Sequence, residues 1–511
     1  MEETRIRLAA LRGMRCGIEK ESLRVRPDGK LATTPHPPAL GSALTHPHIT
    51  TDFSESQLEL ITGAHTGAEA CLAELTQIHQ VVYGAIGEEL LWGSSMPCGL
   101  PADDAIPIGQ YGRSNIGRAK AVYRTGLSNR YGRRMQAISG IHYNWSLPGL
   151  GNAEYFALIR NFRRHGWLLF YLFGASPAVC PSFVAGREHG LQELKPGTLY
   201  LPYATSLRMG RLGYQSEAQD SIAASCNDLE SYGAALEDAM TRIWPEYEKI
   251  GVHGANGEYR QLSTALLQIE NEFYGKIRPK RVIRSGERPL HALRERGVEY
   301  VEVRLMDLDP FAPIGITLPV CRFLDLFLLH CLLGESPPDT PDELGAIGRN
   351  QEKVAARGRE PGLKLERGSQ RVALEEWGGQ LVAECAPLAE ELDSAVGGSS
   401  YREAQSAAAE MIADPALTPS ARVLAAMARD HADSYTAFAL AQSRAHRAAL
   451  SAQPLAPAVA QKFTAMAQAS LAKQREMEAR DTLPFEDWRR KYLSPQMLRP
   501  GTGRDSTPRR T

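Results

Sequence analysis

The chain has 511 residues, and its 58 lysines and arginines nearly balance its 59 aspartates and glutamates. This balance argues against a protein that coats nucleic acid or that binds a membrane through a polybasic patch. The longest apolar stretch, 167–180, is too short and too interrupted to span a bilayer, and it predicts a buried helix followed by a turn. We therefore expect contact with neither nucleic acid nor membrane.

The N-terminal segment and the cysteines both carry information about the compartment of the protein. The N-terminal segment carries charges throughout and lacks an apolar core, so we expect no signal peptide. The eight cysteines are scattered without a C-x-x-C pair, which is typical of reduced thiols and argues against a zinc ribbon. Both observations predict a cytoplasmic protein.

Three stretches of different character follow one another along the chain. Residues 17–148 are rich in short strand-like runs and turns, and residues 152–330 mix helices with strands. The stretch 335–342 (ESPPDTPD) predicts a surface loop. Beyond Val372 the chain is rich in alanine, and its periodicity predicts helices at 372–395, 401–413, 421–451 and 458–480.

The order of these elements bounds the fold class. Strands do not alternate regularly with helices, as a doubly wound parallel sheet would require, so we expect an α+β fold around a largely antiparallel sheet. We expect a catalytic domain over residues 1–370 and a helical region over 371–498 packed on it. The last residues, 499–511, are polar and contain proline and glycine, which predicts a disordered tail.

Two predicted strands carry acids on one face only. In 18–25 (IEKESLRV), which a PDGK turn follows, Glu19 and Glu21 point to the same side because side chains alternate along a strand. In 298–305 (VEYVEVRL), Glu302 and Arg304 share a face with Tyr300, and the opposite face is apolar and suits a core. Taken alone, the first pair more often indicates a solvated strand face.

Two further runs repeat this arrangement. In 141–147 (IHYNWSL), His142 lies on the polar face and the tyrosine and tryptophan on the other. In the second half of 49–62 (ITTDFSESQLELIT), Glu59 shares a face with Gln57, and Asp52 precedes this half. A lone histidine of this kind is more often structural than a ligand, and Asp52 alone fits a turn or cap.

Together these strands predict one cavity into which acids and a histidine point. Such a cavity is unstable without cations, and oxygen ligands with one imidazole suit Mg²⁺ or Mn²⁺ better than zinc. With Arg304 present, phosphoryl transfer is the chemistry that it suits. The chain has no G-x-x-x-x-G-K-[ST] loop, so an ATP-using enzyme here must hold the triphosphate by metals and scattered basic groups.

Long motifs in the same runs resemble the proteobacterial type of glutamate–cysteine ligase. The resemblance is dense from about 17 to 316, and it returns at 414–424 and 477–488. The motifs that carry it are IEKESLRV, TTDFSESQLELIT, ISGIHYNWSLP, YLPYATSLRMGRLGY, LLQIENEFYGKIRPKRVIRSGE and YVEVRLMDLDPFAPIGI. It implies a glutamine-synthetase-like fold, in which a curved antiparallel sheet forms a funnel with helices packed outside.

The resemblance also implies roles for individual residues. Arg304 would contact the transferring phosphate, with Glu302 beside it as the second catalytic residue; an ion pair within the strand is the alternative for Arg304. Two to three Mg²⁺ ions, or Mn²⁺, would be held by Glu19, Glu21, Asp52, Glu59, His142 and Glu302.

The substrate residues follow from the same motifs. Arg208, Tyr214 and Tyr274 would hold cysteine, and Phe53 and Tyr123 would wall a pocket for its thiol. Arg124 is a weaker candidate for a substrate carboxylate. Without the resemblance, these tyrosines would more often be core or rim aromatics.

The implied activity is the first step of glutathione biosynthesis. ATP, as co-substrate, would activate the γ-carboxyl of glutamate as γ-glutamyl phosphate, and the amine of cysteine would displace the phosphate. Glutathione is then a candidate feedback inhibitor, and the resemblance favours a monomer. Three alternatives remain open: a ligase of the same fold with a different acceptor amine, a non-catalytic binding protein, and a metal-dependent hydrolase.

Overall fold

The structure, a computed structural model, describes residues 11–213, 217–220, 222, 224–284 and 286–500. Among these residues, a seven-stranded sheet forms the centre, and every strand pair in it is antiparallel. Along the sheet the strands are β2 (Ile49–Thr51), β3 (Gln57–Ile61), β1 (Arg15–Val25), β5 (Ile141–Ser146), β10 (Tyr300–Met306) and β9 (Ile277–Lys280), and β4 (Leu90–Leu91) also pairs with β1. The prediction of an antiparallel α+β fold is confirmed.

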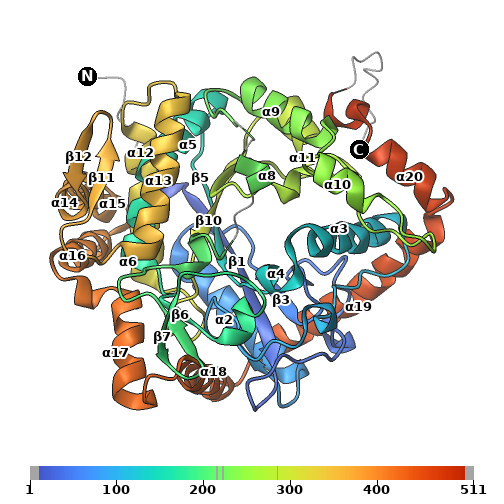
Figure 1. Ribbon diagram of the computed structural model, residues 1–511, viewed down its shortest axis with the longest axis horizontal. Helices are drawn as coiled ribbons and strands as arrows, with labels where there is room; N and C mark the ends of the chain where they lie inside the picture. Colours follow the sequence, from blue (N-terminus) through green and yellow to red (C-terminus); the bar gives the residue numbers. More distant parts are fainter. Residues whose placement is uncertain (1–10, 214–216, 221, 223, 285, 501–511) are drawn as a thin grey trace.

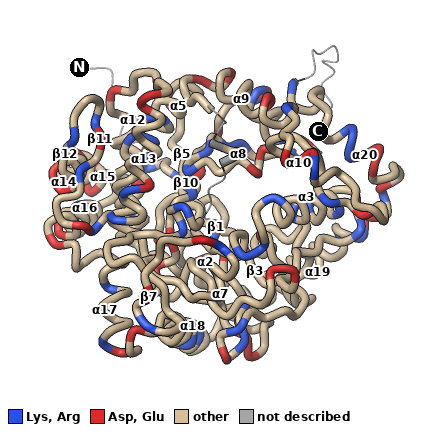
Figure 2. The backbone as a smooth tube through the Cα atoms, viewed as in Figure 1, with Lys and Arg blue, Asp and Glu red and all other residues tan. Residues whose placement is uncertain are grey.

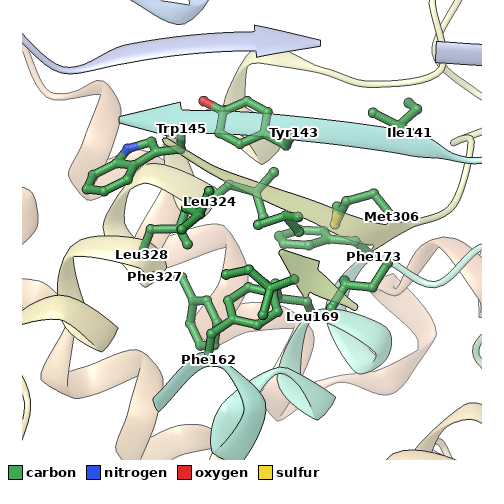
Figure 3. Packing of buried hydrophobic residues seen from close by; sticks show 14 of the residues in the cluster. Ile141, Tyr143, Trp145, Phe162, Leu169, Phe173, Met306, Leu324, Phe327 and Leu328 are labelled. Atoms are coloured by element: carbon green, nitrogen blue, oxygen red, sulfur yellow. The ribbon is translucent and has the colours of Figure 1, made fainter. Parts of the chain in front are cut away.

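One face of this sheet is the apolar face that the alternation predicts. Tyr143 and Trp145 of β5 point away from the polar side into a large buried cluster (Figure 3). The cluster continues through Phe162, Leu169 and Phe327 on three helices that cover this face. These helices are α5 (Asn152–His165), α6 (Trp167–Phe173) and α12 (Leu318–Leu333). All seven residues of α6 are buried, as its apolar sequence predicts.

Two corrections concern the predicted helices. The segment 421–451 is two helices, because Ala432 and Asp433 adopt left-handed backbone conformations with φ of 45° and 63°. The segment 372–395 begins in a hairpin and then divides into two helices at Cys385. The observed elements here are β11 (Lys364–Arg367), β12 (Gln370–Ala373), α14 (Leu374–Glu384), α15 (Ala386–Val396), α16 (Ser400–Ala413), α17 (Pro419–His431), α18 (Tyr435–Ser451), α19 (Pro457–Arg480) and α20 (Phe485–Tyr492).

The remaining elements surround this framework. The predicted loop 335–342 ends early, because α13 begins at Pro341 behind the N-cap Thr340. The other helices are α2 (Ala68–Ala85), α3 (Asn115–Tyr131), α4 (Arg133–Gln136), α7 (Pro181–Val184), α8 (Glu217–Asp220), α9 (Leu229–Thr241), α10 (Pro245–Ile250), α11 (Pro289–Arg296) and α13 (Pro341–Arg357). A small sheet contains β6 (Ala178–Val179), β7 (Gln192–Lys195) and β8 (Thr198–Tyr200).

The C-terminal helices extend round the molecule rather than forming a separate bundle. In Figure 1, α14, α15 and α16 lie on one side of the central sheet, and α19 and α20 lie on the opposite side near α3. Basic and acidic residues occur in every part of the view in Figure 2, as the near-neutral composition predicts. Within the described residues, none of the helices has the length and apolar character needed to cross a membrane.

Candidate active site

The polar face of the sheet borders a cavity of about 710 Å³. This volume is within the range of cavities that bind small ligands. The wall combines residues from β1, β3, β5, β9 and β10 with residues of α3, α19 and α20. The cavity therefore lies where the first three hundred residues meet the C-terminal helices.

The six predicted metal ligands all line this cavity. Strand register explains their meeting: Glu21 lies opposite Glu59, and Glu19 lies opposite His142. Glu302 lies opposite Asn144 of β5, two residues beyond His142. Directly opposed residues in antiparallel strands share a face, so acids that are far apart in sequence converge.

His142 is at the centre of the acidic group. Its Nδ1 lies 3.1 Å from Oε2 of Glu19 and 3.9 Å from Oε1 of Glu302, and its Nε2 lies 3.7 Å from Oε1 of Glu21. One ligand atom from each of Glu19, His142 and Glu302 lies within 4.8 Å of the others. This arrangement can hold one divalent cation, and the chemistry of its donors suits Mg²⁺ or Mn²⁺.

Burial and repulsion between neighbouring carboxylates raise the pKa of two of these acids. Burial and the charge of Asp52 together raise the pKa of Glu21 to about 8. Burial and the charge of Glu19 also raise the pKa of Glu59 well above its usual value. Two carboxyl groups are therefore held towards their neutral forms, which is the expected state of a cation site considered without its cations.

Glu302 differs because cations surround it. Burial alone would raise its pKa, but the charges of Lys280, Arg304 and His142 outweigh burial and hold the pKa well below its ordinary value. The Nζ of Lys280 lies 3.2 Å from Oε1 of Glu302, and Nη1 of Arg304 lies 3.0 Å from Oε2. Arg304 thus forms the strand ion pair that was the alternative for it, and it also lines the cavity.

The predicted substrate residues that the structure describes also line the cavity, and they differ in burial and in the hydrogen bonds that they already make. Phe53 and Tyr123 are almost fully buried, as walls of a small pocket would be. The hydroxyl of Tyr274 accepts a hydrogen bond from Gln136 at 2.9 Å. Arg124 already donates to the backbone carbonyls of Asp52 and Lys120, which leaves less of its guanidinium for a ligand. Tyr214 lies outside the described residues.

Arg208 is fixed from several sides. Its Nη2 donates to the carbonyl oxygen of Arg304 at 2.9 Å, and its Nη1 lies 3.8 Å from Oδ1 of Asp307. Asp307 is itself held, because its carboxylate accepts hydrogen bonds from Ser176 and Ser206. This chain of contacts connects a cavity residue to the interior of the protein.

Six cations of the wall were not predicted: Lys473, Arg284, Lys120 on α3, and Lys276, Arg278 and Lys280 at and within β9. The signal for the last three is the alternation of basic and apolar residues in KIRPK, which is typical of a strand with one basic face. No cavity role was predicted for Met477 and Tyr492 near the C-terminus either.

Comparison with known proteins identifies the family. A model of the glutamate-cysteine ligase family matches residues 3–354. A glutamate–cysteine ligase of Azotobacter vinelandii is 52% identical over 493 residues, which are 92% of this chain and 93% of the relative. A Pseudomonas fluorescens glutamate–cysteine ligase is 50% identical over 488 residues, covering 92% and 91%. The chain belongs to the glutamate–cysteine ligase family.

Solved structures agree with this membership in a ligase family. The crystal structure of glutamate–cysteine ligase from Francisella tularensis in complex with AMP has a TM-score of 0.89 and 36% identity, and covers 94% of this chain and 97% of that one. A bifunctional glutathione synthetase from Pasteurella multocida has a TM-score of 0.71 and 26% identity, and covers 90% and 57%. The protein is therefore an ATP-dependent ligase with the glutamine-synthetase-like fold that the resemblance implies.

Proposed function

We propose that this cavity joins the γ-carboxyl of glutamate to the amine of cysteine in two steps. The γ-carboxylate first attacks the γ-phosphorus of ATP, which gives γ-glutamyl phosphate and ADP. The cysteine amine then attacks the acyl carbon, and inorganic phosphate leaves. The observation that carries this proposal is the convergence of five acids, His142 and Arg304 on one cavity.

The residues have separate tasks in the first step. Two anions must meet, so the electrostatic repulsion between carboxylate and triphosphate has to be reduced. Arg304 neutralises charge on the transferring phosphoryl group, and Glu302 keeps the guanidinium oriented through their 3.0 Å contact. Positioning and charge stabilisation are sufficient for such a transfer, and no covalent enzyme intermediate is needed.

The acidic group fits a set of two to three Mg²⁺ ions, with Mn²⁺ as the alternative. Glu19, Glu21, Asp52, Glu59, His142 and Glu302 would hold them. When bound, the ions supply positive charge beside the phosphates and return Glu21 and Glu59 to their ionised forms.

Acceptor choice depends on the pocket beside Phe53 and Tyr123. Arg208 and Tyr274 would hold the acceptor, with Arg208 on its carboxylate. An apolar pocket discriminates one methylene by only about 1–3 kcal/mol, so we expect slow turnover of 2-aminobutyrate. Assays with a panel of amines separate this proposal from a ligase for a different acceptor, which would prefer another amine to cysteine.

The test is ATP-dependent formation of γ-glutamylcysteine by the wild type and by Glu19→Gln, Glu302→Gln and Arg304→Ala. We expect each variant to lose at least 100-fold in kcat, since each removes a charge that acts on the transferring group. Wild-type rates in all three variants would refute the assignment of the site. Phosphate release without glutamate would instead favour a hydrolase.

We also propose the wider organisation that the sequence predicts. Residues 1–370 would form the catalytic domain and 371–498 a helical region packed on it, which the hydrogen bond from Tyr401 to Asp325 supports. Arg499, in the expected tail 499–511, forms an ion pair with Glu237, and 501–511 lie outside the described residues. We further propose that the protein is cytoplasmic and monomeric, and that glutathione inhibits it.

A further inference from the structure

The strand β9 places three cations on the cavity wall. It is the end strand of the sheet and pairs with β10. Ile277 and Pro279 are buried on its inner side, and Ile277 belongs to the large core cluster. Lys276, Arg278 and Lys280 alternate with these residues and line the cavity. The strand thus has one apolar side and one basic side, which we call the basic face of β9.

Within the part of the chain that the structure describes, the charge of Arg278 is not cancelled by an ion pair. Arg278 lies opposite Glu302, but Lys280 and Arg304 already contact that carboxylate. Among the described residues, no carboxylate oxygen lies within ion-pair distance of Arg278. Its Nη2 donates to the carbonyl oxygen of Asn271 at 3.1 Å, and its Nε is buried without a partner. A guanidinium that is only 6% exposed would normally pair with an anion.

Burial makes the charged form of the Arg278 guanidinium less favourable. Removal from water, followed by the charge of Arg304, lowers the pKa of Arg278 to about 10. The group is still charged at neutral pH, so a buried positive charge faces the cavity. A bound anion would relieve that unfavourable situation.

The length of the basic face of β9 fits some anions of the reaction better than others. Alternate residues of a strand are about 6.6 Å apart, so the three cations extend over roughly 13 Å. A single carboxylate of glutamate or cysteine can meet one or two of them. A polyphosphate carries its negative charge along its length and can meet all three. We propose that Lys276, Arg278 and Lys280 bind the polyphosphate chain of ATP, and that β9 thereby replaces a phosphate-binding loop.

This assignment rests on the proposed function and extends it to residues that the mechanism above did not use. It also gives a direction to the bound nucleotide. Arg304 lies on the neighbouring strand, and its backbone N–H donates to the carbonyl oxygen of Lys276 at 2.8 Å. The polyphosphate would therefore lie along β9 with its terminal phosphoryl group towards Arg304 and the acids.

The first experiment measures KM for each substrate in Arg278→Gln and Lys276→Gln. We expect KM for ATP to rise at least tenfold and KM for glutamate and for cysteine to stay within twofold. Arg278→Lys keeps the charge and should restore part of the affinity. Arg281→Gln is the matched control, because Arg281 follows the strand and pairs with Glu299 rather than lining the cavity.

The second experiment uses binding without turnover. Inorganic tripolyphosphate should compete with ATP on the wild type more strongly than orthophosphate does, and Arg278→Gln should lose most of this difference. Calorimetric titration with ATP and Mg²⁺ should show a matching loss of affinity. Melting temperatures within a few degrees of the wild type identify variants that fold, and Lys276→Gln carries the test if Arg278→Gln does not.

The outcomes separate this inference from the proposed function. If the wild type forms γ-glutamylcysteine and Arg278→Gln raises KM for glutamate while KM for ATP is unchanged, the basic face binds a carboxylate and the inference is wrong. Equal affinity of tripolyphosphate for the variant and the wild type would also overturn it. If the wild type forms no γ-glutamylcysteine, the proposed function itself fails.

Discussion

Gly140 shows how a single missing side chain makes room for a cavity residue. Its N–H donates to Oε2 of Glu21 at 2.7 Å, so its backbone already orients one of the acids. A Cβ at this position would overlap the guanidinium of Arg208, and no backbone atom is among its nearest neighbours. A substitution here would therefore displace the buried Arg208 side chain, while no backbone atom has to move first.

From this geometry we predict that Gly140→Ala folds but binds the acceptor poorly. Displacement of Arg208 would break its contacts with the Arg304 carbonyl oxygen and Asp307. We expect KM for cysteine to rise about tenfold or more, which corresponds to ~1.4 kcal/mol or more, and the melting temperature to fall because buried Asp307 loses its cationic neighbour. Gly84→Ala, where a Cβ meets nothing within 4 Å, is the control and should leave KM for cysteine unchanged. An unchanged KM for cysteine in Gly140→Ala would remove Arg208 from the acceptor site.

The sequence could predict the glutamates of the cavity because each one lies on a strand that is apolar on its other face. Glu19, Glu21, Glu302 and Arg304 follow from alternation alone. Asp52 lies in the turn between β2 and β3, where no periodicity applies, and only the resemblance indicated it. The cations of β9 were missed because a four-residue strand that contains proline gives a weak pattern.

At the scale of elements, a buried carboxyl connects α12 to the sheet and to α16. Asp325 accepts hydrogen bonds from Tyr143 of β5 at 2.8 Å and from Tyr401 of α16 at 3.3 Å. Burial raises its pKa to about 7, against an ordinary value of 3.8. The folded protein therefore binds a proton here between about pH 4 and pH 7 that the unfolded chain releases.

The sign of the pH dependence follows directly. Below pH 4 both states are protonated, and as the pH rises towards 7 only the unfolded state ionises, so stability falls. We predict that Asp325→Asn removes this fall, with a gain relative to the wild type of up to ~4 kcal/mol between pH 4 and pH 8. Urea unfolding at several pH values measures it. A constant difference between variant and wild type across this range would contradict the prediction.

A second element-scale prediction concerns the docking of α19. Gly41, with φ of 80°, lies so close to this helix that a Cβ would be 2.8 Å from Cα of Ala467. The N–H of Ser42 donates to Oγ of Ser470 at 2.9 Å beside it. We expect Gly41→Ala to destabilise the protein and to increase amide exchange in α19, because a backbone atom of the helix must move.

The chain offers a matched control for backbone strain. Gly29 has φ of 81°, and a Cβ there would make only ordinary contacts with Leu440 at 3.6 Å or more. Gly29→Ala should cost about 1–2 kcal/mol from the left-handed conformation alone, and Gly41→Ala should cost more. Equal losses in the two variants would show that the approach of α19 is not tight.

The prediction of one helix over 421–451 was wrong because tertiary contacts determine the backbone conformation there. The segment 421–451 has no proline or glycine, and the signal for the turn at Ala432 and Asp433 is Ser434, whose side chain caps α18 by accepting a hydrogen bond from the N–H of Ala437. In the structure this turn lets Phe438 of α18 and Met427 of α17 enter the same buried cluster. Burial of apolar side chains outweighs the cost of two left-handed residues here.

At the scale of the whole molecule, the C-terminal part completes a cavity that begins in the N-terminal part. The match to the family model ends at residue 354, yet Lys473, Met477 and Tyr492 belong to the cavity wall. Hydrogen bonds from Asn115 to Asp481 and Leu483 attach the start of α3 to the segment that follows α19. Helix periodicity predicts α19 but carries no information about the surface on which it packs.

The stability of the whole chain should depend on divalent cations. Four glutamates and Asp52 repel one another in this cavity. A cation that binds only the folded state stabilises that state by about 2.7 kcal/mol when its concentration is a hundred times its Kd. We predict that Mg²⁺ raises the melting temperature of the wild type, that EDTA reverses the rise, and that Glu19→Gln moves the Mg²⁺ midpoint to higher concentration. Glu295→Gln tests a second acid and histidine group, formed by half-buried Glu287 and His291 and exposed Glu295. Arg296 already pairs with both glutamates there, so this variant should keep the response of the wild type. A melting temperature that does not respond to Mg²⁺ would contradict the prediction, and a response that Glu295→Gln abolishes would place the cation at the second group rather than at Glu19, His142 and Glu302.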